Sequence, residues 1–378
     1  MSAPRAQVVT VGAVSVPGAE RAAAAVAALT AAGLTVGAQV FVEEDDAALQ
    51  RVLEAPAMLT LVIAPSAGSP ANTVQRVLGR LTAKRLPQDA AVWTGPETEA
   101  GWAVEAGDHR FVVLPAAGRI EQLLHRHLPA FVGGRLGPDG PATRTLKTIG
   151  VPLGQVEDRL KPWLDGSGDV DVSVVAVDDE IWVRLRARGS STAVAALTTH
   201  EAQIAARLGA DCYGHDGDTL EQVVGRLLIE RGLMLSVAES CTGGLVGHRL
   251  TSVAGSSAYF ERGVVVYSNR AKQELLGVPE EMLRTHGAVS APTAEAMARG
   301  IQAASGSRCG LAITGIAGPD GGTPSKPVGT VFIGVAVGDD VQAHRFVFPG
   351  NRAAIKWRSA QAALDLLRRR VSSEPAPR

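Results

Sequence analysis

The chain has 378 residues, of which 46% are hydrophobic and 20% charged, and its formal net charge is −1 at pH 7. This composition is typical of a globular protein with two or three domains, and the charge argues against nucleic acid or an anionic membrane as the main partner. The start of the chain has no apolar core of a signal peptide, and no run of about 18 apolar residues predicts a membrane span. Three scattered cysteines, Cys212, Cys241 and Cys309, predict neither disulfides nor a zinc site, so we expect a cytoplasmic protein without a metal.

Short apolar runs alternate with helix-period segments at the start of the chain, and this alternation predicts a doubly wound α/β domain with a parallel sheet. The expected strands are 7–13, 35–42, 59–64, 91–93 and 111–114, and the expected helices are 20–32, 45–54, 73–81 and 119–128. Ligands bind at the carboxyl ends of strands in such sheets. Here those ends read Gly12-Ala13-Val14, Pro65-Ser66-Ala67-Gly68 and Pro115-Ala116-Ala117-Gly118, without the carboxylates that hold Mg²⁺. We therefore expect no metal-dependent chemistry in this domain.

The segment 134–143 is rich in Gly and Pro and reads as a linker. After it, a small α+β module is predicted from a helix at 153–164, strands at 171–176 and 181–187, and a helix at 191–208. We place the first domain at 1–143, the module at 144–215, a last α/β domain at 216–371 and a disordered tail at 372–378.

The last domain again alternates strands and helices. Its first helix follows the apolar stripe from Leu220 to Leu228, is capped by Thr219 or Asp218, and ends at Gly232. Further strands are expected at 233–237, 263–267, 311–314, 328–337 and 343–348, and further helical segments at 245–253, from 271, from 290 to 304, and at 351–371.

One stretch of this domain, Ser236–Gly244, combines a strand end, a polar turn and a helix start. Ser240 and Thr242 supply hydroxyls, while Gly243 and Gly244 allow the backbone to approach a ligand closely. The alternative reading is a helix cap without further function.

Three other polar loops lie near strand ends or helix starts and hold Ser256 with Ser257, Tyr267 with Lys272, and Thr314 with Gly315. Every candidate nucleophile is a hydroxyl, and no His–Asp pair accompanies them. A serine without a histidine can be activated by a neutral lysine, a role open to Lys272 if burial lowers its pKa.

Backbone N–H groups at 242–244 or 314–315 can form an oxyanion hole. Arg352 can bind a phosphate at a helix start. By spacing alone, Lys272 and Arg352 can equally be surface charges.

Several long motifs in this region resemble a known family. They read VAESCTGGLVGHRLTSVAGSSAYFERGVVVYSNRAKQELLGV, HGAVS, AITGIAGPDGGT, KPVGTVFIGVA and FPGNR. They are similar to the C-terminal domain of the competence/damage-inducible CinA family, the nicotinamide-nucleotide amidohydrolase. The resemblance covers about 216–371 and implies hydrolysis of nicotinamide mononucleotide to nicotinic acid mononucleotide and ammonia, in pyridine-nucleotide salvage and without a cofactor.

The resemblance also implies residue roles. The family's catalytic set matches Ser240, Ser257, Tyr267 and Lys272, and either serine is a candidate nucleophile. We expect attack by Ser240, with Lys272 as base, Tyr267 assisting it and Ser257 in a hydrogen-bond relay. The substrate pocket is expected to include Thr242, Gly243, Gly244, Thr314, Gly315 and Arg352, with Arg352 on the 5′-phosphate. Family members are commonly dimers, so a homodimer is expected.

Upstream, WTGPETEAGWAVEAGDHRFVVLP and GVPLGQVEDRLKPWL resemble parts of full-length CinA proteins, whose first domain is MoaB/MogA-like and can carry a metal-dependent ADP-ribose pyrophosphatase. This chain lacks the family's Gly-Gly-Leu-Gly-Pro-Thr run and its paired aspartates, so we expect that the activity is lost. The middle module is similar to the family's KH-like domain but lacks a Gly-x-x-Gly clamp, so no RNA binding is implied. The alternative to an enzyme is a non-catalytic assembly protein linked to competence or DNA damage.

Overall fold

The computed structural model describes residues 5–12, 16–32, 34–65, 73–95, 98–116, 120–133, 143–165, 169–177, 179–187 and 191–373. Contacts divide the chain into two compact units. One comprises 1–146, 153–177 and 181–208, and the other comprises 147–152, 178–180 and 209–378. Within the described residues, no helix has both the length and the apolar character that crossing a bilayer requires.

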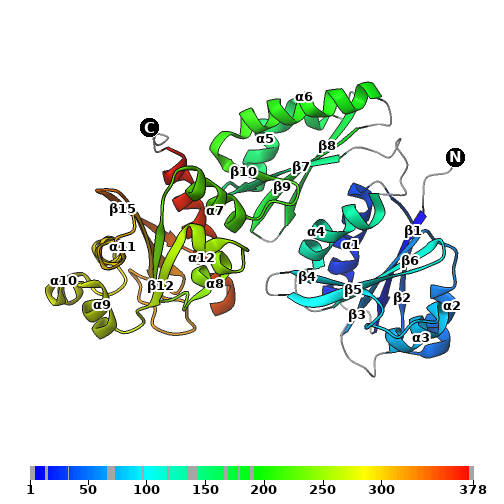
Figure 1. Ribbon diagram of the computed structural model, residues 1–378, viewed down its shortest axis with the longest axis horizontal. Coiled ribbons are helices and arrows are strands. Elements are labelled where there is room, and N and C mark those ends of the chain that lie inside the picture. The colour runs from blue at the N-terminus through cyan, green and yellow to red at the C-terminus, as the bar shows by residue number, and fades with distance from the viewer. Residues whose placement is uncertain are drawn as a thin grey trace. The chain divides into compact units, whose positions relative to one another are not determined.

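The first sheet has six strands in the order β2-β1-β3-β6-β5-β4 (Figure 1). The strands are β1 Arg5–Val11, β2 Thr35–Val42, β3 Leu59–Ala64, β4 Ala91–Gly95, β5 Thr98–Ala106 and β6 His109–Pro115. The first four strands in that order are parallel, whereas β5 pairs antiparallel with both β6 and β4. The expected α/β sheet is therefore confirmed, with an antiparallel edge added to its parallel part.

Helices cover both faces of this sheet. They are α1 Val16–Ala31, α2 Asp46–Leu53, α3 Thr73–Thr82 and α4 Ile120–Gly133. One apolar core joins α1 and α4 to one face, and a second core joins α2 and α3 to the other. Successive side chains of a strand point to opposite faces, so Val8 enters the first core and Val9 the second.

Strand β5 was not expected from the sequence. Small residues weaken its apolar pattern, and one of them is needed where the strands pack. A Cβ on Gly101 would lie 2.8 Å from the Leu114 side chain. Three loops that lack metal-binding carboxylates in the sequence lie outside the described residues, at 13–14, 66–72 and 117–118. Most of the expected linker and the tail from 374 also lie outside them.

The middle module is built on a four-stranded sheet of order β10-β7-β9-β8. Its elements are β7 Thr143–Ile149, α5 Leu153–Leu164, β8 Val170–Val177, β9 Glu180–Ala187, α6 Ser191–Leu208 and β10 Cys212–His215. The two helices have the expected bounds. Strands β7 and β10 were missed, because β7 has only two apolar residues, Leu146 and Ile149, and β10 has only four residues.

The C-terminal sheet has five strands in the order β12-β11-β13-β14-β15. The strands are β11 Leu235–Glu239, β12 Phe260–Val265, β13 Cys309–Gly315, β14 Thr330–Val337 and β15 Asp340–Val347. The helices are α7 Leu220–Glu230, α8 Leu245–Thr251, α9 Asn269–Leu276, α10 Glu280–His286, α11 Ala291–Ser305 and α12 Arg352–Ser372. Strands β12, β11 and β13 are parallel, and β14 and β15 follow antiparallel.

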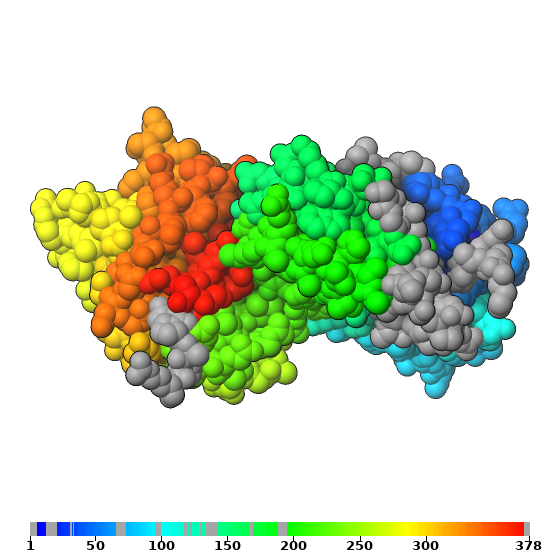
Figure 2. All heavy atoms as spheres, turned by 90° about the horizontal axis from the view of Figure 1, so that it is seen from above, coloured from blue at the N-terminus to red at the C-terminus, as the bar shows by residue number. Residues whose placement is uncertain are grey.

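Three helices cover each face of this sheet. The core on one face includes residues of α7, α8 and α12, and the core on the other includes residues of α9, α10 and α11. In the space-filling view, the yellow segment of α9 to α11 lies against the orange segment of β13 to β15 (Figure 2). Helix α11 can approach the sheet closely because Gly310 and Gly334 have no side chain. A Cβ on either would lie 2.3 Å from a carbonyl oxygen of α11.

Several strands are shifted from their expected positions: β1 begins two residues early, β15 begins three residues early, and β11 and β12 are shifted as follows. Strand β11 was expected at 233–237 and begins and ends two residues later, which adds Glu239 to a strand that already includes Ser236, and both polar residues are buried. Ser236 Oγ is satisfied there by Ser307 Oγ at 2.8 Å. Strand β12 was expected at 263–267 and begins three residues earlier, which leaves Tyr267 in the loop after it.

Candidate active site

The parallel strands of the C-terminal sheet bring three polar loops to one edge. Ser240 follows β11, Tyr267 follows β12, and Thr314 and Gly315 end β13. Backbone hydrogen bonds join these ends, since Ser240 N donates to Ile313 O and Val266 N donates to Glu239 O. The carboxyl edge of an open α/β sheet is where such folds bind ligands.

Ser240 and Lys272 meet at this edge. Lys272 Nζ lies 3.2 Å from Ser240 Oγ, and both residues are buried, with 1% and 7% of their surface exposed. Lys272 reaches the site from α9, whose N-cap is Ser268. The structure thus joins two residues that are 32 positions apart in the sequence.

The surroundings of Lys272 lower the pKa of its amine. Its Nζ donates to Val266 O at 2.8 Å and to Tyr267 O at 3.3 Å. No carboxylate pairs with it among the residues that the structure describes, and burial lowers its pKa. A neutral amine has two N–H donors and one lone pair. In the structure Nζ donates to Ser240 Oγ as well as to the two carbonyls. Once the amine is neutral, the carbonyls can take its two donors, and its lone pair can then accept the Ser240 hydroxyl.

Glu239 fixes the turn that carries Ser240. Its carboxylate accepts N–H bonds from Gly244 at 3.0 Å, Val246 at 3.1 Å and Gly247 at 2.8 Å. It therefore caps α8, whose N-cap Gly244 has no side chain to do so. Sequence reasoning gave Glu239 no role. An acidic residue just before a helix start was the available signal.

Cys241, next to Ser240, is not a competing nucleophile. It is buried, and burial raises the pKa of its thiol to about 12. The nucleophilic form of cysteine is the thiolate, which is scarce at neutral pH under these conditions.

The side chains of Tyr267 and Arg352 contact each other. Arg352 Nη2 donates to Tyr267 Oη at 3.3 Å, and Arg352 Nη1 donates to Gly318 O at 2.8 Å. The Tyr267 side chain is 63% exposed. Its contact with Lys272 is therefore made through the main-chain carbonyl, whereas its phenol faces Arg352.

The other expected pocket residues are held in different ways. Thr314 Oγ1 donates to Ala288 O at 2.8 Å, and Gly315 is packed so closely that a Cβ would lie 2.7 Å from the Val331 side chain. Thr242 is fully buried, and its Oγ1 has no hydrogen-bond partner among the described residues. The N–H groups of Gly243 and Gly244 are already bound to Ser240 O and Glu239.

Ser257 lies at the opposite, amino-terminal ends of the parallel strands. It belongs to the 3₁₀ turn Ser256–Ala258, which precedes β12, and Phe260 at the start of β12 pairs with Leu235 at the start of β11. The five residues of β11 separate these ends from Ser240, which at about 3.3 Å per residue is about 16 Å. The structure thus does not bring Ser257 beside Ser240 and Lys272, where the expected hydrogen-bond relay would need it.

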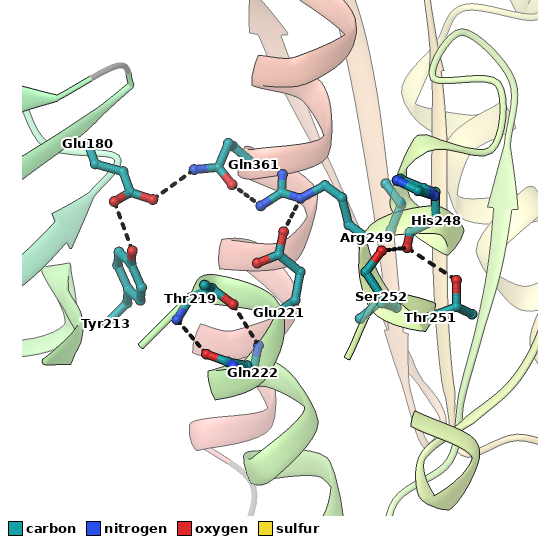
Figure 3. Close-up of polar contacts among 12 residues, drawn as sticks. Glu180, Tyr213, Thr219, Glu221, Gln222, His248, Arg249, Thr251, Ser252 and Gln361 are labelled. Atoms are coloured by element: carbon teal, nitrogen blue, oxygen red, sulfur yellow. Dashed lines mark hydrogen bonds and ion pairs between the residues drawn. The ribbon is translucent and has the colours of Figure 1, made fainter. Parts of the chain in front are cut away.

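A buried polar network joins helices α7, α8 and α12 (Figure 3). Arg249 of α8 is bound through Nε to Glu221 of α7 and through Nη2 to Gln361 of α12. Gln361 Nε2 donates to Glu180 at 3.1 Å, and Glu180 accepts from the Tyr213 hydroxyl at 2.8 Å. Arg249 also lies over the Trp357 ring at 4.3 Å. The network joins α8, which follows the Ser240 turn, to α12, which begins with Arg352.

Fold and site together define an α/β protein with a buried serine–lysine pair at the carboxyl ends of the parallel strands of its C-terminal sheet. The model of the CinA C-terminal domain matches residues 217–371, and that of the damage-inducible protein CinA KH domain matches residues 143–214. The chain belongs to the CinA family.

Relatives support this assignment. The chain is 36% identical over 391 residues to the CinA-like protein of Geobacter sulfurreducens, covering 93% of this chain and 94% of that protein. It is 45% identical over 231 residues to the putative competence-damage inducible protein of Caldicellulosiruptor bescii, where the match spans 61% of this chain and only 56% of the relative. A crystal structure of the competence damage-inducible protein A from Klebsiella pneumoniae is 35% identical, covering 41% of this chain and 97% of that one with a TM-score of 0.40.

Proposed function

We propose that this protein hydrolyses the carboxamide of nicotinamide mononucleotide to nicotinic acid mononucleotide and ammonia. The observation that carries the proposal is the buried pair of Ser240 and Lys272, 3.2 Å apart. A scaffold protein has no need of a buried lysine beside a serine, so the pair favours an enzyme over a non-catalytic assembly protein. The motifs shared with the amidohydrolase domain supply the substrate class.

In the proposed reaction, Lys272 takes the Ser240 proton while Oγ bonds to the carboxamide carbon. The N–H groups of Cys241 and Thr242 have no hydrogen-bond acceptor among the described backbone contacts and are suited to bind the oxyanion. The C–N bond then breaks, and Lys272 returns the proton to the leaving ammonia. Water, activated by Lys272, hydrolyses the acyl-serine and restores the hydroxyl.

The remaining residues would bind the substrate. Arg352 is the proposed ligand of the 5′-phosphate, and Tyr267 orients its guanidinium through the 3.3 Å contact. The turn at Thr242, Gly243 and Gly244, with Thr314 and Gly315 beside it, would line the pocket. Ser257 is left out of the mechanism. We further propose that the protein is a homodimer.

Incubating the full chain with nicotinamide mononucleotide tests the proposal. Ammonia and nicotinic acid mononucleotide are expected in equal amounts, and Ser240→Ala should stop both. Replacing the neighbouring thiol, as Cys241→Ala, provides a matched control that leaves the hydroxyl in place and should retain turnover. If the folded protein releases no ammonia, the proposed activity is refuted.

The first domain is expected not to hydrolyse ADP-ribose. Between Ala64 and Thr73 the sequence has no aspartate or glutamate, and a metal-dependent pyrophosphatase needs such carboxylates. The purified protein should therefore release no AMP from ADP-ribose in the presence of Mg²⁺, Mn²⁺ or Co²⁺. Clear turnover with any of these ions would contradict the prediction.

A further inference from the structure

Two cations lie one helical turn apart at the start of α12. Among the residues that the structure describes, Arg352 binds only uncharged groups, Gly318 O and the Tyr267 hydroxyl. Lys356 lies four residues further on, which places both residues on the same side of the helix. Lys356 is half-buried, and within the part of the chain that the structure describes it has neither an ion pair nor a hydrogen bond. Two neighbouring cations without an acidic partner form a site suited to an anion.

The ammonium of Lys356 lies against the turn that carries the nucleophile. Lys356 Nζ is 3.6 Å from the position that a Cβ on Gly243 would occupy. Gly243 is three residues beyond Ser240, and its φ of 63° is one that side chains rarely adopt. The glycine therefore leaves open the space between the turn and the lysine.

A second observation at the same turn also points to a ligand. Thr242 directly precedes Gly243, is 0% exposed, and its Oγ1 finds no hydrogen-bond partner among the described residues. Buried hydroxyls are almost always hydrogen-bonded. The turn at 242–243 thus brings a hydroxyl and a cation together, and neither has a hydrogen-bond or ion-pair partner among the described residues.

We propose that Lys356 is a specificity-determining residue that binds the phosphate of a mononucleotide substrate together with Arg352. The inference rests on the proposed amidohydrolase function and adds a residue to it. The planar guanidinium of Arg352 suits two phosphate oxygens, and Lys356 provides a compact charge on the side of the Gly243 turn. The positive end of the α12 dipole favours the same anion. Lys356 would thus make the enzyme prefer a mononucleotide to the corresponding nucleoside.

The test compares nicotinamide mononucleotide with nicotinamide riboside, which lacks the phosphate. In Lys356→Met, the ratio of the two kcat/KM values is expected to fall by about 10- to 100-fold, as for loss of one hydrogen bond between charged groups. Lys356→Arg keeps the charge and should keep most of the preference. Lys161→Met removes an exposed lysine that pairs with Asp158 on α5, and it should leave the ratio unchanged. An unchanged ratio in Lys356→Met, or equal losses with both substrates, overturns the proposal.

A binding measurement separates this inference from the proposed function. Inorganic phosphate, titrated calorimetrically into the full-length wild-type protein and into Lys356→Met, reports the anion site without catalysis. Weaker phosphate binding in Lys356→Met supports the site even if the wild type releases no ammonia, a result that would refute only the proposed reaction. Equal phosphate affinity in the two proteins overturns the role of Lys356, whatever the activity.

Discussion

Replacing Lys272 with methionine is expected to lower kcat for ammonia release by at least about 100-fold. Methionine fills a similar volume in the buried site but cannot accept the Ser240 proton across the 3.2 Å contact. The variant should stay folded, because no carboxylate among the described residues is left unpaired by the loss of the amine. Steady-state kinetics with nicotinamide mononucleotide, together with circular dichroism, measure the two effects separately.

A second variant distinguishes a base from a fixed positive charge. Lys272→Arg retains a cation that stays protonated at every accessible pH, so it should be as inactive as Lys272→Met. Arg270→Met provides the matched control, because Arg270 lies on the same helix, is exposed, and pairs with Glu274. It should keep the wild-type rate. Substantial activity in Lys272→Met would show that another group deprotonates Ser240.

The pH profile gives an independent check on Lys272. Only the neutral amine can act as base, and burial lowers the pKa of Lys272 below its usual 10.5. The rate should therefore rise with pH until this lowered pKa is passed and then level off. In Lys272→Met the residual rate should lose this rising limb. A wild-type rate that falls with rising pH over the same range would contradict the assignment.

Periodic patterns and local turn chemistry explain which elements could be predicted. Helix α7 begins after its predicted cap Thr219, whose hydroxyl forms a capping box with Gln222, and α11 begins after Ser290. The errors fall where tertiary contacts override local pattern. Strand β11 continues to Glu239 because its carboxylate accepts three hydrogen bonds from backbone N–H groups at the start of α8. In the sequence, the sign of such a pairing is an acidic residue just before a helix start, which does not identify its donors.

The candidate site was predictable in residue type but not in arrangement. Motif matching placed Ser240, Lys272, Tyr267 and Arg352 in one site, and these four are joined by contacts in the structure. The same matching could not tell that Ser257 precedes β12 and so lies at the other edge of the sheet. Parallel pairing of β11 and β12 decides this, and strand order is a property of the whole domain rather than of a motif.

Arg249→Met is expected to destabilise the C-terminal domain by about 3–5 kcal/mol, the usual cost of leaving a buried charge without its partner. Arg249 is 4% exposed and Glu221 is 9% exposed. Burial by itself would raise the pKa of Glu221, but the Arg249 guanidinium outweighs it and lowers that pKa. Methionine removes the guanidinium and leaves the carboxylate in a site with little water. Urea denaturation of the full-length protein at pH 7, followed by circular dichroism, measures the loss.

Acid pH should identify the cause of this loss. A lowered pKa stabilises the wild type above the pKa of Glu221 in the unfolded chain, and this contribution disappears as pH falls through the folded value. In Arg249→Met, burial without the cation raises the pKa of Glu221. Protonation of Glu221 at lower pH then removes the cost of its buried, unpaired charge. The difference in stability between the wild type and Arg249→Met should therefore narrow towards acid pH.

Glu221→Gln combined with Arg249→Met should recover part of this difference at pH 7, because no charge is then left buried. Arg284→Met, which breaks the exposed pair with Glu281, should leave stability unchanged. A difference that stays constant with pH would mean that lost packing on Trp357, rather than the stranded carboxylate, accounts for the destabilisation.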